Sequence, residues 1–272
     1  MLKHYNTSTL LTPLPPWRRA LIRLSHPSKI NLEKISKVVV MDPILCAKLL
    51  SSVNGNERFH GKPDEVIHNV LAREKTLLWD KLLTYNASYY KVIAACPHFS
   101  LKKYWRDAIS VATAAYQFCK LKKLNDTLCV QAYFAGVLHN IGLIVLTYMH
   151  PVAMNTLLQK STSTQQLLQL EKERFGQDHS AFGAEILKQQ QVPEPITNII
   201  QDCERPLDKS SHSELSQTIN HALEWQRSRS RKQTSLGQRL DAHQFRQFVE
   251  AEQHIINMSD IFSYETPINA KR

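Results

Sequence analysis

Apolar side chains recur along this chain every three to four residues, the spacing that lines one face of an α-helix. Leu32, Ile35 and Val38 follow this pattern, and a longer apolar series runs from Trp105 to Cys119. No stretch shows the sustained two-residue alternation typical of strands. Only 7 glycines occur in 272 residues, which also disfavours folds rich in tight turns. The pattern therefore predicts an all-α protein.

Helix boundaries are visible as capping residues. Asn31 and Asp42 have side chains that cap helix starts, and Pro43 suits the first turn of the helix after Asp42. Asp178 is likewise expected to cap the start of a later helix. Further helices are expected around Trp17–Leu24, as two segments within 64–96, and at 44–53, 152–158, 163–175, 181–190 and 194–203.

The segment Leu128–Met149 contains no Asp, Glu, Lys or Arg and reaches membrane-spanning length at 22 residues. However, Gln131, His139 and Asn140 lie inside it, and such polar groups are costly in a membrane. The run therefore predicts two buried helices joined near residues 140–142, in a protein that makes no membrane contact.

Charge is unevenly distributed. Residues 1–124 hold 20 Lys or Arg against 8 Asp or Glu, whereas the whole chain has a formal charge of +10. This basic excess is either a solvated face or a surface for an acidic partner or nucleic acid.

The five cysteines are scattered and form no paired motif, which indicates neither a disulfide framework nor a zinc ribbon. Together with the absence of a signal-peptide core, this predicts a reducing compartment and a cytoplasmic location.

Four short segments carry a family resemblance. They are Leu14-Pro15-Pro16, Met41–Asn54, Gly136–Gly142, and Phe175–Glu194 with Gly183 inside it. In this order they make residues 11–205 resemble the HDOD domain, a bacterial signalling branch of the HD metal-phosphohydrolase superfamily. The resemblance implies a helical bundle with an N-terminal lobe at 1–100 and an HD-like core at 101–205. The more polar residues 206–272 are expected to form a helical C-terminal extension.

The superfamily resemblance also implies where a metal would be held, by histidines and an adjacent His-Asp pair. In this chain the pair is His139-Asn140, and a neutral amide binds a hard cation more weakly than a carboxylate does. The other vestigial positions are Asp107, Cys203 and Glu204, where the superfamily carries histidines. We therefore expect no metal, no other cofactor and no catalytic residue. A metal held by Asp107, His139, Glu204 and His221 remains the alternative.

Two histidines and one basic run remain as candidates. His139 is either a ligand or a core residue held through its ring, and His179 is either a support to the site or a neighbour of a helix cap. The basic residues are expected in a loop that either is solvated or contacts phosphates: Arg227, Arg229, Arg231 and Lys232.

These features favour a non-catalytic signalling module that binds a protein partner. The resemblance implies a partner related to two-component or cyclic di-GMP signalling. The alternatives are a residual metal-dependent phosphohydrolase or phosphodiesterase, and nucleic-acid binding through the basic N-terminal lobe.

Overall fold

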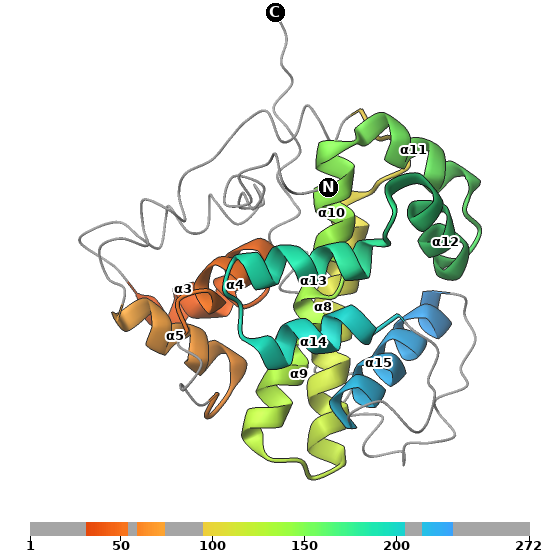
Figure 1. Cartoon of the computed structure of the whole chain (residues 1–272). Coiled ribbons are helices and arrows are strands. Elements are labelled where there is room, and N and C mark those ends of the chain that lie inside the picture. The colour runs from red at the N-terminus through yellow and green to blue at the C-terminus, as the bar shows by residue number, and fades with distance from the viewer. Residues whose placement is uncertain (1–30, 54–58, 74–94, 205–213, 231–272) are drawn as a thin grey trace, which may run out of the picture.

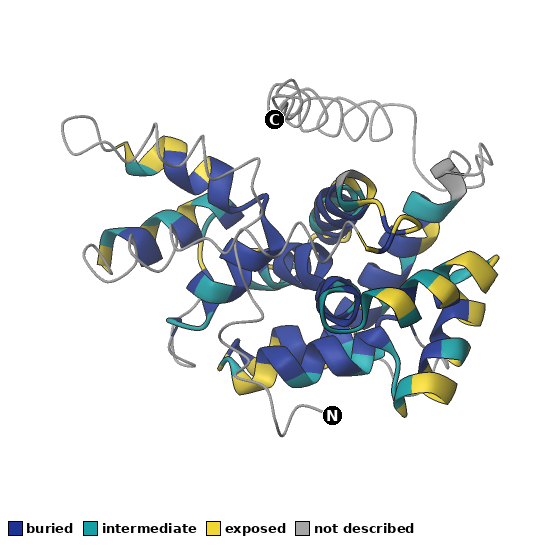
Figure 2. Ribbon diagram, turned by 90° about the horizontal axis from the view of Figure 1, so that it is seen from above, coloured by how far each residue is buried: buried dark blue, intermediate teal, exposed yellow. Residues whose placement is uncertain are grey.

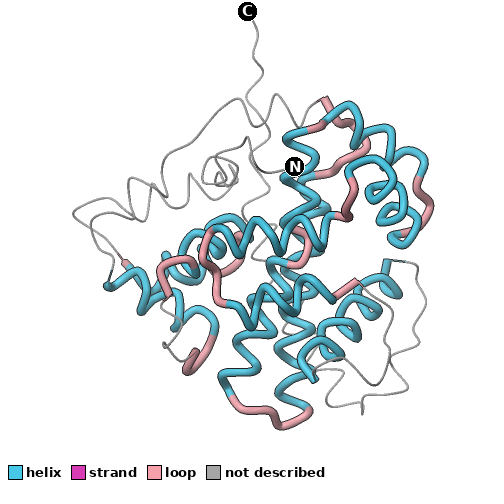
Figure 3. Tube along the Cα trace, viewed as in Figure 1, coloured by secondary structure: helices cyan, strands magenta, loops and turns pink. Residues whose placement is uncertain are grey.

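The computed structural model describes residues 31–53, 59–73, 95–204 and 214–230. Within these ranges every regular element is an α-helix and no strand occurs (Figure 3). The helices are α3 (Leu32–Val39), α4 (Pro43–Leu50), α5 (Pro63–Arg73), α8 (Leu101–Leu121), α9 (Asp126–Leu138), α10 (Ile141–Met149), α11 (Pro151–Lys160), α12 (Thr164–Phe175), α13 (His179–Gln189), α14 (Glu194–Asp202) and α15 (Glu214–Ser230). The predicted all-α class is confirmed.

Predicted capping side chains start three of these helices. Asn31 Oδ1 accepts one backbone N–H bond at 2.9 Å, and Asp42 Oδ1 accepts two, at 2.8 and 2.9 Å. Asp178 Oδ1 accepts another at 2.9 Å. The first N–H groups of a helix have no partner inside it, so each cap fixes a boundary. The helix expected around Trp17, and residues 74–94 with the second helix expected before Cys96, lie outside the described residues.

Helices α8 and α9 form the central pair of the bundle (Figure 1). They can approach closely because α9 has a glycine at the contact: a Cβ atom on Gly136 would lie 2.6 Å from the Cα atom of Ala112. Helix α4 packs on α9 and attaches the lobe of α3, α4 and α5, while α14 and α15 pack against the same central pair. The central pair thus supports helices from both ends of the described chain.

The uncharged run Leu128–Met149 becomes most of α9 and all of α10. By length and mean hydropathy (1.6) the stretch Asp126–Met149 resembles a membrane span, but 83% of its apolar window is buried inside the fold. The run is therefore interior to the bundle, as predicted.

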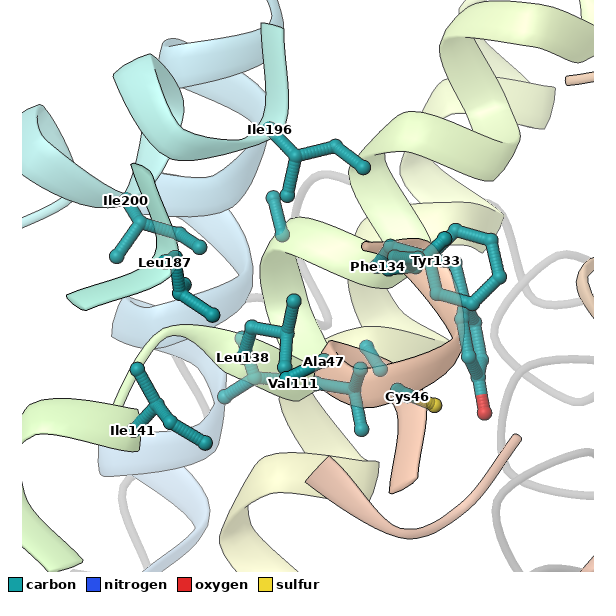
Figure 4. Close-up of a cluster of buried hydrophobic side chains, with 14 of the residues drawn as sticks. Cys46, Ala47, Val111, Tyr133, Phe134, Leu138, Ile141, Leu187, Ile196 and Ile200 are labelled. Carbon is teal, nitrogen blue, oxygen red and sulfur yellow. The ribbon is translucent and has the colours of Figure 1, made fainter. Parts of the chain in front are cut away.

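Buried side chains from several helices converge on α9. Leu187 of α13 and Ile196 and Ile200 of α14 gather near Leu138 (Figure 4), and buried residues face the interior throughout the bundle (Figure 2). All five cysteines are free and buried, so the prediction of no disulfide framework is confirmed.

Helix α15 also belongs to this core, although it lies in the segment expected to be a polar extension. Leu215, Ile219, Leu223 and Trp225 are all buried, with at most 8% of each exposed. Because these residues recur at helical spacing, they give α15 one apolar face, which packs against α8 and α9.

Candidate functional site

A pocket of about 270 Å³ opens beside the break between α9 and α10. Its lining includes six polar side chains from five parts of the chain that bear on the predicted site: Asp107, His139, Asn140, His179, Glu204 and Arg227. Four of these are vestigial metal-site positions. The fifth such position, Cys203, does not line the pocket, and its thiol donates to the Ile200 carbonyl at 3.1 Å.

The helix break itself places His139 and Asn140. His139 is the last residue associated with α9, and Asn140 occupies the position before α10. The Asn140 side chain makes no capping hydrogen bond to α10. Its amide remains at the pocket wall instead.

Two glycines bring His179 to the same place. A Cβ atom on Gly142 of α10 would lie 1.9 Å from the backbone oxygen of His179 and 2.7 Å from the backbone nitrogen of Gly183. No side chain fits there, so α10 and α13 cross with their backbones in contact. This contact sets the start of α13 beside the α9–α10 break.

His139 is a buried histidine held through its ring, as one of the two sequence interpretations predicted. Only 2% of the residue is exposed, and Nδ1 lies 2.7 Å from the carbonyl oxygen of Gly136. A carbonyl only accepts hydrogen bonds, so Nδ1 donates. Burial lowers the pKa of His139 to about 4, and the ring is neutral near pH 7.

His179 is hydrogen-bonded to the buried carboxylate of Glu171 in α12. Its Nδ1 lies 2.7 Å from Glu171 Oε2, and its backbone N–H donates to the same oxygen at 2.9 Å. Burial by itself lowers the pKa of His179, but the charge and hydrogen bond of Glu171 outweigh it and raise the pKa overall. His179 therefore supports the site with a defined ring orientation.

Both carboxylates that line the pocket are paired with basic side chains of this chain. Lys103 Nζ lies 2.8 Å from Asp107 Oδ2, one helical turn away. Arg227 Nη2 contacts both oxygens of Glu204, at 2.6 and 2.5 Å, and the Glu204 side chain is only 4% exposed. Basic side chains of the protein therefore neutralise both carboxylates of the pocket.

Part of the basic run Arg227–Lys232 is helical, whereas the sequence predicted a loop. Arg227 and Arg229 lie within α15, so the expected loop is wrong for these two residues. The apolar face of α15 is buried against α8, and this packing stabilises the helix as far as residue 230. Arg231 and Lys232 lie outside the described residues.

The HDOD domain model matches residues 11–206 of this sequence. The chain belongs to the HDOD domain family. Among solved structures it is similar to the MmoQ response regulator from Methylococcus capsulatus str. Bath, with 17% identity and a TM-score of 0.64 over 83% of this chain and 88% of that one. A virulence factor from Campylobacter jejuni has 16% identity and a TM-score of 0.57, covering 83% of each chain. Comparison with curated proteins gave no match.

The metal implied by the superfamily does not fit the donors of this HDOD pocket. Among the described residues, no group of three or more His, Cys, Asp or Glu side chains is arranged to hold a metal ion. His221, the fourth ligand of the alternative site, does not line the pocket. Asn140 contributes no charge, and the carboxylates of Asp107 and Glu204 are already paired.

Sequence reasoning missed two pairs in this HDOD domain. Glu171 lies in α12, eight residues before His179 at the start of α13. Arg227 lies in α15, 23 residues after Glu204. Neither spacing is a periodic signal. By contrast, Lys103 and Asp107 are four residues apart in one helix and were recognisable as neighbours.

Proposed function

We propose that this HDOD protein is a non-catalytic regulatory module that binds a signalling protein in a bacterial cytoplasm. The observation that supports it is the internal neutralisation of the pocket. Lys103 pairs with Asp107, Arg227 pairs with Glu204, and the acidic member of the His-Asp pair is replaced by Asn140. A hydrolytic metal needs ligands of net negative charge, and these side chains offer little of it.

The structural likeness supports the regulatory part of this proposal. MmoQ is named a response regulator, and it shares the fold of this chain over most of its length. Helical modules of this kind can transmit a signal by contact alone, because a partner need only bind one conformation better than another.

We place the partner surface on the basic N-terminal lobe. Lys34 and Lys37 are exposed on α3, in the part of the chain that carries the basic excess. An acidic partner would be attracted to such a face over several ångströms, which raises the rate of association.

Cross-linking and affinity capture from the native cell, using the chromosomally tagged protein, test this proposal. We expect one signalling protein to be retained by the wild type and lost from the double variant Lys34→Glu/Lys37→Glu. Lys160→Glu, an exposed charge reversal in the acidic middle segment, is the matched control and should retain it. Failure to capture a specific partner, or equal capture by all three proteins, would contradict the proposal.

A further inference from the structure

Helices α11 and α12 form a pair at the edge of the bundle, which we call the α11–α12 arm (residues 151–175; Figure 1). Helix α11 packs on α10, and α12 packs on α11. Leu158, Thr164 and Leu167 of this arm line the pocket, and so do residues 98–100, which precede α8. The pocket therefore has one wall from the arm and another from the segment before α8.

The arm is attached at each end through a residue with a non-helical backbone. His150, with φ −135° and ψ 57°, separates α10 from α11, and Pro151 has no N–H with which to continue the hydrogen bonds of α10. Gly176 follows α12 with φ 82°, and the space around it is open. Residues at the ends of elements absorb the changes in φ and ψ when one part of a protein rotates on another. The arm therefore has a candidate hinge residue at each end.

The two junctions lie side by side. The His150 ring stacks on Phe175, the last residue of α12, with ring centroids 5.3 Å apart and planes 25° apart. Glu171 accepts two hydrogen bonds from His179, and these span Gly176. A rotation about a line through the junctions moves these contacts least, because they lie beside it. The junctions thus define one hinge axis.

A single side-chain contact joins the arm to the segment before α8. Asn155 Oδ1 on α11 accepts the backbone N–H of His98 at 3.0 Å and lies 2.9 Å from Nδ1 of the same residue. An amide oxygen only accepts, so Nδ1 donates whether the ring is neutral or charged. Within the described residues, no other hydrogen bond or ion pair links these two parts. Because His98 is exposed, water can replace both hydrogen bonds, and breaking them costs little.

We propose that the α11–α12 arm rotates about the hinge at His150 and Gly176, and that the His98–Asn155 contact is the latch that holds it closed over the pocket. Opening separates the wall that contains Leu167 from the wall that contains Phe99 and leaves the α8–α9 pair intact. A partner that binds the open arm better than the closed one shifts this equilibrium. This role in signalling rests on the proposed regulatory function, whereas the hinge and latch rest on the contacts of the arm.

The test is the rate at which N-ethylmaleimide labels a cysteine introduced at Leu167, measured by mass spectrometry on the full chain. Leu167 is only 7% exposed, so a thiol there reacts when the arm is open. Adding Asn155→Ala removes the acceptor of both latch hydrogen bonds and should raise the labelling rate about tenfold, since the rate follows the open population. Asn155→Asp keeps an acceptor oxygen and should label as slowly as the chain with Asn155. Leu158→Cys, on the same arm, is a second reporter.

Two controls separate opening of the arm from loss of the fold. Thr156→Ala changes the neighbouring residue, whose hydroxyl donates to the Val152 carbonyl of the same helix at 3.1 Å, and should leave the rate unchanged. The buried native thiols of Cys46, Cys119 and Cys129 should stay unlabelled.

Equal labelling with and without Asn155→Ala, or labelling of the native thiols in parallel with the reporter, would overturn this inference. Purified protein suffices for this measurement, whereas the proposed function is tested by capture of a partner. Either result can therefore fail without the other.

Discussion

At the scale of single residues, the pocket is defined by which side chains hold one another. Asn140 stands where the superfamily has an acid, and the remaining carboxylates of the pocket have basic partners from α8 and α15. The Arg227–Glu204 pair matters most because the Glu204 side chain is 4% exposed. A carboxylate in that position is costly unless a cation stays with it.

Replacing Arg227 with methionine should therefore lower the free energy of unfolding by about 2–4 kcal/mol, since it leaves Glu204 buried without its partner. Denaturant unfolding measures this change. The double variant Arg227→Met/Glu204→Gln should recover part of the loss. Lys37→Met breaks an exposed pair with Glu33 and should have a much smaller effect. If Arg227→Met were as mild as Lys37→Met, the pair would not stabilise the site.

The buried His139 ring makes stability depend on pH. Its pKa is about 4 in the folded protein and 6.5 for an ordinary histidine, so the unfolded chain takes up a proton between these values that the folded chain does not. The free energy of unfolding therefore decreases as the pH falls from about 6.5 to about 4, by about 3 kcal/mol in total.

This contribution can be measured as the difference in unfolding free energy between wild type and His139→Leu at several pH values. The variant is expected to be less stable near pH 7, but the gap should narrow steadily as the pH is lowered toward 4. His60→Gln, at an exposed histidine, is the control and should run parallel to the wild type. A constant gap for His139→Leu would mean that the ring is not held neutral by burial.

At the scale of elements, the site depends on how α10 crosses α13. Gly142 and Gly183 let the two backbones touch, and that contact places His179 beside the α9–α10 break. Helix α13 also packs on α14, which ends beside Glu204. The crossing therefore positions two walls of the pocket.

Gly142→Ala should lower the free energy of unfolding by more than about 3 kcal/mol, because the new methyl group would meet backbone atoms that cannot move independently. Gly176→Ala is the comparison. Gly176 has a φ of 82° but open space around it, so only the left-handed backbone penalty of about 1–2 kcal/mol applies. Equal losses in thermal or denaturant unfolding would show that α10 and α13 do not cross so closely.

Much of this helical arrangement was predictable from sequence, because caps and apolar periodicity are local signals. Asn31, Asp42 and Asp178 marked helix starts, and Asn140 marked the break in the uncharged run. The pairing of Glu204 with Arg227 was not predictable. It depends on how α15 packs after residues 205–213, and no periodic pattern connects positions in two different helices. The basic run consequently suggested a loop where the helix continues.

At the scale of the whole molecule, the pocket is completed by a helix beyond the segment that the family model matches. That match ends at residue 206, whereas Leu223, Gln226 and Arg227 of α15 line the pocket. The division at residues 205 and 206 stays a prediction, but the buried face of α15 indicates that the core needs this helix.

A chain ending at residue 213 should therefore unfold at a much lower temperature than a chain ending at residue 230. The shorter chain lacks the buried side chains of Ile219, Leu223 and Trp225 and leaves Glu204 without Arg227. Thermal unfolding and size-exclusion chromatography of the two chains provide the comparison. Equal melting temperatures would show that α15 is dispensable to the core.

We propose that this HDOD protein keeps the family fold without hydrolytic chemistry. The most direct measurement is turnover of nucleoside monophosphates and cyclic dinucleotides by the full chain, purified without chelator and supplied with Mn²⁺, Fe²⁺ or Mg²⁺. We predict a rate equal to that of the heat-inactivated protein with every metal. Saturable, metal-dependent turnover that disappears in His139→Leu would contradict the claim.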